Sequence, residues 1–126
     1  MPSPISQSLT STDLESLTDT INGYTYSNNP IFEMCLGDKV LWYVMAYGSA
    51  SHVFHMHGNG YKYANAGQYA TSINDGVGKT FVMDATGAGL WQVICHVDHH
   101  LSRGMVANYK VYSGSCPLEP LASSSS

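Results

Sequence analysis

The chain contains little charge: Lys, Arg, Asp and Glu together make up 11% of its 126 residues, and the net charge is −4. No block of basic residues stands out, so nucleic acid and anionic membranes are poor candidates for partners. The longest apolar run, residues 40–47, is too short to cross a bilayer, and no membrane span is expected. The polar start of the chain lacks the charged-then-apolar pattern of a signal peptide.

Helical periodicity is also absent, since no segment after residue 20 carries a capped apolar stripe at helical spacing. Short apolar segments instead alternate with turn sequences such as LGDK, NAGQ, INDG and TGAG. Several short strands at this interval predict an all-β fold, a β-sandwich, in a single domain. We expect residues 1–18 to be a flexible leader or linker, residues 19–116 to be the folded domain, and residues 117–126 to be a disordered tail.

All six histidines lie in two short stretches, SHVFHMHG (51–58) and WQVICHVDHHLSRGM (91–105). The second stretch also contains Cys95 and Met105. Imidazole, thiol and thioether groups are the side chains that bind transition metals, so this distribution indicates a metal site.

Strand geometry divides these residues between two faces of a sheet, because side chains on a strand alternate in direction. His52 has the opposite parity to His55 and His57, and Cys95 has the opposite parity to both of its neighbours. One site would therefore use His52 and Cys95. The other site would use the remaining strand histidines, His55, His57 and His96.

The spacing Cys-x4-His-x4-Met, from Cys95 through His100 to Met105, lets a loop fold back onto the sulfur. Two imidazoles, one thiolate and a weak axial thioether are the ligand set of a blue-copper electron-transfer site. Zinc is the main alternative, but structural zinc prefers several thiolates and makes no use of methionine. A His-x-His pair, a buried free Cys or a core Met is ordinary alone, and only the joint pattern favours copper.

Three motifs, SHVFHMHGNGY, CLGDKVLWYVMAYG and ICHVDHHLSRGMVANYKV, resemble the last cupredoxin domain of a multicopper oxidase. The similarity is to the ceruloplasmin and hephaestin group, whose A-type domains also make up coagulation factors V and VIII. It runs from about Ile21 to Cys116. The resemblance implies a cupredoxin-like Greek-key β-sandwich, or β-barrel, with copper (Cu+/Cu2+) as the cofactor.

The resemblance also implies a role for each residue of the two stretches. The residues that match type 1 copper ligands are His52, Cys95, His100 and Met105. His55 matches a type 2 copper ligand, and His57 and His96 match type 3 copper ligands of a trinuclear cluster. This division is the same as the one that strand parity predicts.

The three cysteines leave Cys35 and Cys116 as a possible pair once Cys95 is placed in the metal site. The alternative is two buried thiols in a reducing compartment. Similar A-type domains carry a disulfide at both positions, so the resemblance implies a bond between Cys35 and Cys116. Such a bond favours an extracellular location, either as a secreted protein or as the ectodomain of a membrane-anchored one.

The sequence departs from the family pattern at two positions. The family motif reads His-Cys-His, with both histidines on type 3 coppers, whereas Ile94 precedes Cys95 here. Ceruloplasmin-like ferroxidases also carry a glutamate four residues before the type 1 histidine, and this position is Gly48. Other acidic residues are candidates for receiving a substrate metal, namely Asp98, Asp19 and Glu15.

We therefore expect the electron-entry domain of a ferroxidase-like multicopper oxidase, which passes electrons from Fe2+ or a small organic reductant to O2. Electrons would enter near an exposed His100. Half of the cluster ligands in this family come from a different cupredoxin domain, of the same chain or of a neighbouring subunit. The isolated chain is therefore expected to be inactive in O2 reduction.

Two alternatives remain. One is a stand-alone blue-copper electron-transfer protein, in which the cluster histidines would be vestigial. The other is a non-catalytic A domain that serves protein interaction. The intact type 1 set argues against the second alternative, and the retained cluster histidines argue mildly against the first.

Overall fold

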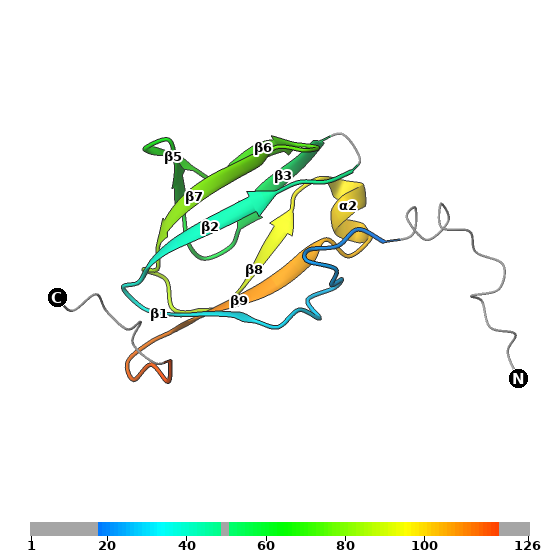
Figure 1. Ribbon diagram of the computed structural model, residues 1–126. Coiled ribbons are helices and arrows are strands. Elements are labelled where there is room, and N and C mark those ends of the chain that lie inside the picture. Colours follow the sequence, from blue (N-terminus) through cyan, green and yellow to red (C-terminus); the bar gives the residue numbers. More distant parts are fainter. Residues whose placement is uncertain (1–17, 49–50, 119–126) are drawn as a thin grey trace, which may run out of the picture.

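Strands with alternating burial form most of the structure, a computed structural model that describes residues 18–48 and 51–118. Two β-sheets face each other (Figure 1). The first sheet has the strand order β1 (Phe32–Cys35), β9 (Val106–Tyr112), β8 (Gly89–Cys95), β3 (Ser51–Met56) and β6 (Ala70–Asn74). The second sheet has the order β2 (Lys39–Met45), β7 (Gly78–Asp84), β4 (Tyr61–Tyr63) and β5 (Ala66–Gln68). The expected all-β sandwich is confirmed.

The chain passes repeatedly from one sheet to the other. β1 and β2 follow each other in the sequence but lie in different sheets, and so do β3 and β4. β1 pairs in parallel with β9, whereas the other strand pairs are antiparallel. This order brings β3 and β8, which carry the two histidine stretches, side by side in the middle of one sheet.

Aromatic side chains fill the space between the sheets. Phe54 of β3 stacks on Phe81 of β7, with ring centroids 4.7 Å apart, and Tyr61 packs edge-on against the same ring at 4.8 Å. Phe81 and Tyr109 are fully buried. Such rings contribute both apolar area and specific packing, so they hold the two sheets in a fixed relation.

The turn after β3 is tied to the core by polar contacts. The buried Tyr109 hydroxyl donates to the carbonyl of His57, and Asn59 Nδ2 donates to the same hydroxyl at 3.1 Å. Gly58 has φ +80°, and a Cβ there would lie 2.2 Å from the ring of Trp91, so only glycine fits this turn. The turn therefore fixes the backbone that leaves β3 with its histidines.

One helix, α2 (Asp98–Ser102), follows β8. No capped apolar stripe in the sequence indicates this helix. A helix of 5 residues is too short to show a repeated apolar stripe, so periodicity could not detect it. No helix within the described residues is long and apolar enough to cross a membrane. The expected leader 1–18 and tail 117–126 lie mostly outside the described residues, and both boundaries remain predictions.

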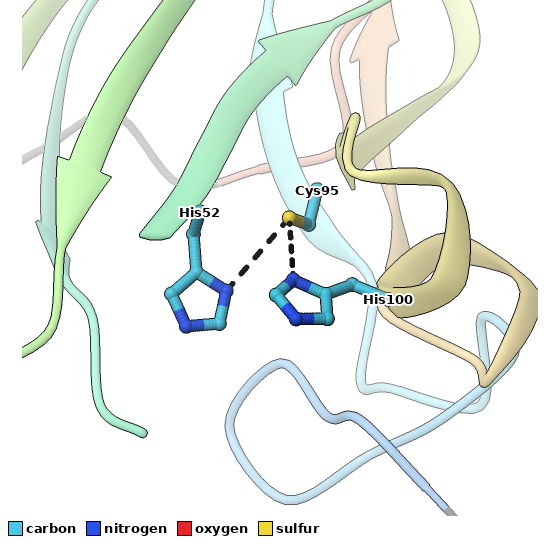
Figure 2. Close-up of side chains that lie close together, drawn as sticks. All are labelled: His52, Cys95 and His100. Atoms are coloured by element: carbon cyan, nitrogen blue, oxygen red, sulfur yellow. Dashed lines mark hydrogen bonds between the residues drawn. The ribbon is translucent and has the colours of Figure 1, made fainter. Parts of the chain in front are cut away.

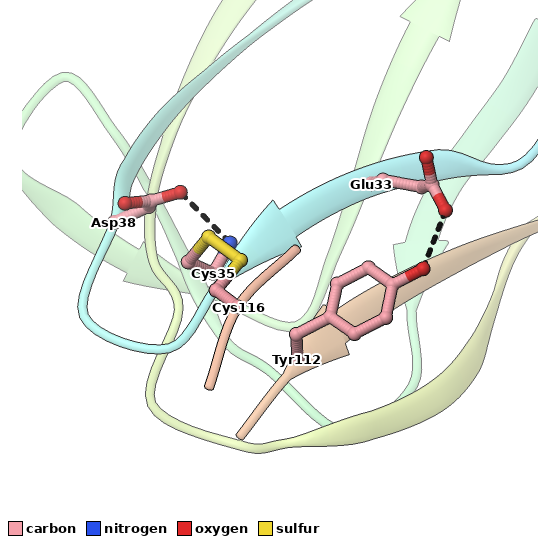
Figure 3. The surroundings of a disulfide bond; sticks show 5 residues. All are labelled: Glu33, Cys35, Asp38, Tyr112 and Cys116. Carbon is pink, nitrogen blue, oxygen red and sulfur yellow. Dashed lines mark hydrogen bonds between the residues drawn. A yellow bond between two sulfur atoms is a disulfide. The ribbon is translucent and has the colours of Figure 1, made fainter. Parts of the chain in front are cut away.

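A disulfide joins Cys35 at the end of β1 to Cys116 beyond β9, with Cα atoms 5.7 Å apart (Figure 3). The pairing implied by the family resemblance is confirmed, and Cys95 is free. The backbone N–H of Cys35 donates to Asp38 Oδ2 at 2.8 Å, which orders the turn that leaves β1. The bond closes a loop across a sequence separation of 81 residues, nearly the whole described domain.

Replacing both disulfide cysteines (Cys35→Ala with Cys116→Ala) should lower the free energy of unfolding by about 4 kcal/mol, because a long loop is no longer closed in the unfolded chain. Urea unfolding of the metal-free protein measures this change without added stabilisation from a bound ion. Cys35→Ala alone should have nearly the same effect. A double variant as stable as the wild type would contradict the assigned role of the bond.

Candidate metal centre

The pairing of β3 with β8 places Cys95 beside His52. Cys95 lies opposite Phe54 in the register, and directly opposed residues project from the same face of a sheet. His52 is two residues before Phe54 on β3, so it also projects from this inner face. The backbone N–H of Val53 points to Cys95 Sγ at 3.4 Å. The thiol and the first imidazole therefore meet at one end of the core.

Helix α2 supplies the second imidazole. His100 Nδ1 lies 3.4 Å from Cys95 Sγ, and His52 Nδ1 lies 3.8 Å from the same sulfur (Figure 2). The ligand atoms of these three residues all lie within 4.8 Å of one another, and no other group of this kind occurs among the described residues. The three side chains are buried, with exposed fractions of 4%, 4% and 1% for His52, Cys95 and His100.

A backbone carbonyl orients His52. His52 Nε2 lies 2.7 Å from the carbonyl oxygen of Gly48, so this nitrogen carries the proton and Nδ1 presents its lone pair to the sulfur. Gly48 has φ +74°, and its N–H donates to Asp75 Oδ1 at 2.7 Å. Asp75 therefore fixes the position of Gly48, and the carbonyl of Gly48 orients His52. Asp75 could not be predicted as part of the site, since its position in the INDG turn is the only signal in the sequence.

Met105 lies next to this group. It is half-buried and lines a cavity of about 960 Å3 together with His52 and Cys95. Its carbonyl accepts a hydrogen bond from the N–H of Cys95 at 3.1 Å, and its N–H donates to the carbonyl of His100 at 3.1 Å. The backbone of Met105 is thus fixed to Cys95 and His100, which keeps this residue beside the group.

Burial controls the charge of His100. Removal from water lowers the pKa of His100, the nearby carboxylate of Asp19 opposes this change, and His52, His99 and Arg103 add to it. A neutral imidazole is the form that binds a metal. The expectation of an exposed His100 is wrong, because α2 turns this ring inward against Cys95. The exposed histidine of the helix is His99, whose ring centroid lies 4.4 Å from that of His100.

The candidate residues for a substrate metal lie in different places. Asp19 lies near His100, and its Oδ2 is 3.9 Å from Arg103 Nη1. Asp98 is exposed in the first turn of α2. Glu15 lies outside the described residues. Of the two candidates within the described residues, Asp19 is the one whose charge acts on His100.

His55, His57 and His96 lie together on the outer face of the same sheet. The ring centroid of His55 is 5.2 Å from that of His57 and 5.3 Å from that of His96. His55 is half-buried, and the other two are exposed. Ile94 lies directly opposite His55 in the register and is 5% exposed. The face thus carries three imidazoles with an apolar side chain among them.

The donor chemistry of the inner group fits copper. Ring nitrogens of both His52 and His100 face the Cys95 sulfur, so three potential ligand atoms lie together in a buried place. A cation bound by the thiolate would contact all three lone pairs at once. Two imidazoles, a thiolate and a nearby thioether suit copper, whereas the outer face lacks the ligands of a complete trinuclear cluster.

These features define a copper-binding cupredoxin-type domain, and the comparisons with known proteins identify its family. The family model described as multicopper oxidase matches residues 1–115, so the chain belongs to the multicopper oxidase family. Membership of this family implies copper as the cofactor, and the group of His52, Cys95 and His100 is one that could hold the ion.

Individual relatives agree with this assignment. The chain is 36% identical to rat ceruloplasmin over 96 residues, which are 72% of this chain and 9% of that protein. It is 33% identical to human hephaestin over 106 residues, which are 80% of this chain and 9% of that protein. A multicopper oxidase from Campylobacter jejuni, described as a metallo-oxidase, superposes with a TM-score of 0.66 at 21% identity. That alignment covers 86% of this chain and 26% of the other, and it establishes the cupredoxin fold.

The metal-free protein should lose stability as the pH falls below about 6.5, the usual pKa of histidine. The lowered pKa of His100 means that the unfolded chain binds a proton there more readily than the folded chain does. Stability from this residue is therefore present above that pH and is lost as the pH falls through the folded-state value. Urea unfolding at a series of pH values gives the free energy of unfolding at each pH, and its change with pH is the slope to be compared.

The slope should be much shallower for His100→Gln and only slightly changed for His99→Gln, because the exposed His99 contributes less than burial does to the lowered pKa of His100. An equal pH dependence in wild type and His100→Gln would contradict the assigned effect of burial.

Proposed function

We propose that this chain is the electron-entry domain of a multicopper oxidase and holds one type 1 copper through His52, Cys95, His100 and Met105. One observation carries the proposal. The Cys95 sulfur lies 3.8 Å from Nδ1 of His52 and 3.4 Å from Nδ1 of His100, and all three side chains are buried. Bound copper would supply one-electron oxidation and reduction at this position.

The protein surroundings suit repeated electron transfer. His52 is held by the Gly48 carbonyl, and Cys95 is held in a paired strand, so both ligands are fixed before the ion binds. Burial excludes water from the sulfur and the two imidazoles. Little rearrangement is then needed when the charge of the site changes by one electron, which is the requirement for rapid exchange.

A covalent route leads from this site to the other face of the sheet. Cys95 projects inward and the next residue, His96, lies on the outer face with His55. One peptide bond therefore joins the type 1 ligand to the histidines of the outer face. In a complete enzyme, His55 would bind type 2 copper, and His57 and His96 would bind type 3 copper. A second cupredoxin domain would supply the remaining ligands.

The proposed reductant is Fe2+ or a small organic molecule, with O2 as the final acceptor in the assembled enzyme. Asp19 supports a ferroxidase-like role, because its Oδ2 accepts no hydrogen bond within the described residues and lies close to His100. Asp98 is the second candidate for this contact. The disulfide favours an extracellular protein or ectodomain, since such bonds persist in oxidising compartments.

The length of the match limits what this chain does alone. The chain spans about 9% of the length of the curated relatives that it matches. A stand-alone electron-transfer protein is the second candidate, favoured by a type 1 ligand set within one chain and by Ile94 on the cluster face. A non-catalytic A domain for protein interaction would not require the buried Cys95 between two imidazoles.

Copper-loaded, oxidised wild type should show the intense blue absorption of a thiolate bound to Cu2+. Cys95→Ser should abolish this absorption, because the thiolate is the donor of the charge-transfer band. His99→Gln, which changes an exposed histidine of α2, should keep it. A colourless wild type that holds a stoichiometric amount of zinc would refute the copper assignment.

The isolated chain should not reduce O2 to water, although its type 1 copper should exchange electrons with a one-electron reductant. The reason is that Ile94 cannot bind a metal and half of the cluster ligands belong to another domain. Oxygen-electrode measurements with excess reductant give the rate. Rapid four-electron O2 reduction by the purified monomer would show that the chain is a complete oxidase.

A further inference from the structure

We propose that two copies of this chain form a dimer in which the edge strand β2 of one copy pairs antiparallel with β2 of the other. β2 pairs with β7 on one side, and no strand of residues 18–48 and 51–118 pairs with it on the other side (Figure 1). The four-stranded sheet carries no histidine, so this inference goes beyond the proposed function and does not depend on a bound metal.

The other three sheet edges in the described part of the chain are protected against such pairing. At β1 the N–H of Cys35 already donates to Asp38 Oδ2 at 2.8 Å. At β6 the carbonyl of Ser72 accepts a hydrogen bond from Lys79 Nζ at 2.8 Å. β5 has only 3 residues. Very short strands and lysine side chains are common ways in which proteins prevent an edge from pairing with another chain.

β2 lacks these protections. It has 7 residues, contains no proline, and its single charged residue, Lys39, stands at the first position. On its outer face Leu41, Tyr43 and Met45 are 48%, 78% and 59% exposed. Tyr47 extends the row at 73%, and its hydroxyl lies 2.6 Å from Met45 Sδ. A contiguous row of exposed apolar side chains along an open edge marks an interaction site.

The backbone of β2 presents its free hydrogen-bonding groups at alternate residues. The N–H of Ala85 donates to the carbonyl of Asp38, and the N–H of Ala46 donates to the carbonyl of Val77. Even-numbered residues of this strand therefore turn their backbone groups toward β7. In an antiparallel ladder the odd-numbered residues then turn theirs toward the open edge, and Leu41 is one of them.

The sequence of β2 complements itself when two copies run antiparallel about a two-fold axis at Trp42. Leu41 then lies opposite Tyr43 of the partner subunit, and Val40 lies opposite Val44 of the partner subunit. The pair of Leu41 with Tyr43 exchanges backbone hydrogen bonds, because both residues are odd-numbered. Both kinds of pair are apolar, and such cross-strand pairs stabilise a sheet.

Charge also favours a second copy as the occupant. In this register Lys39 faces Met45 of the partner subunit, so no like charges lie opposite each other. The ammonium of Lys39 is paired within its own chain, 3.2 Å from Asp84 Oδ1. An unrelated strand would have to match this apolar row by chance, whereas a second copy supplies the matching row by symmetry.

Sedimentation equilibrium of the full wild-type chain should show a dimer that dissociates on dilution. Leu41→Lys with Tyr43→Lys should raise the dissociation constant at least about tenfold, because both outer pairs then lose their apolar contact and hold like charges. Tyr69→Lys with Leu90→Lys is the matched control. It adds the same charge at two exposed apolar residues outside β2, and the dimer should be unchanged.

Leu41→Glu with Tyr43→Lys tests the register, because opposite charges then face each other in both outer pairs. At low salt this variant should dimerise at least about tenfold more tightly than the variant with two lysines. A wild type that stays monomeric at every concentration would overturn the inference. Equal dimerisation of the two charge variants would also overturn it. Circular dichroism and the blue absorption of the copper-loaded protein are measured on each variant, so loss of the dimer is distinguished from unfolding and from failure of the type 1 site.

Discussion

The pairing of β3 with β8 is the constraint on which both groups of histidines depend. Phe54 opposite Cys95 and His55 opposite Ile94 place one set of side chains inside the sandwich and the other set outside. A slip of one residue would exchange the two faces, because the side-chain period of a strand is two. The stacked rings of Phe54 and Phe81 oppose such a slip, since it would move Phe54 out of the core.

The inner group has a free-energy cost that a bound cation offsets. Two imidazoles and a thiol are removed from water, which costs free energy unless their polar atoms are well paired. Gly48, held by Asp75, keeps His52 in the ligating tautomer even without metal. The protein therefore holds three potential ligands together and out of water before any ion binds, which is typical of a functional site.

Strand parity was sufficient to separate the inner residues from the outer ones, because it depends only on the backbone. The structure places His52 with Cys95 and His55 with His96, as parity predicts, while their roles as ligands remain proposals. The disulfide was predicted only through the family resemblance, since three cysteines alone leave other pairings and free thiols open. The sandwich itself followed from short apolar segments between turns.

Features that depend on non-local contacts could not be predicted. Helix α2 is too short for a periodic signal, and the burial of His100 depends on how that helix docks. The contact between Gly48 and His52 was equally hidden, because it is made by a backbone carbonyl, which leaves no signal in the sequence. Asp19 lies near His100 only because its backbone N–H pairs with the carbonyl of Arg103, 84 residues away in the sequence, at 3.2 Å.

The central claim is that one thiolate and two imidazoles of this chain bind the same copper ion. X-ray absorption at the copper edge tests it most directly, on wild-type protein loaded with one equivalent of copper. The account predicts one short sulfur scatterer and two nitrogen scatterers per copper, in both the reduced and the oxidised protein. A shell of nitrogen and oxygen atoms without sulfur would contradict it, because the copper would then lie away from Cys95.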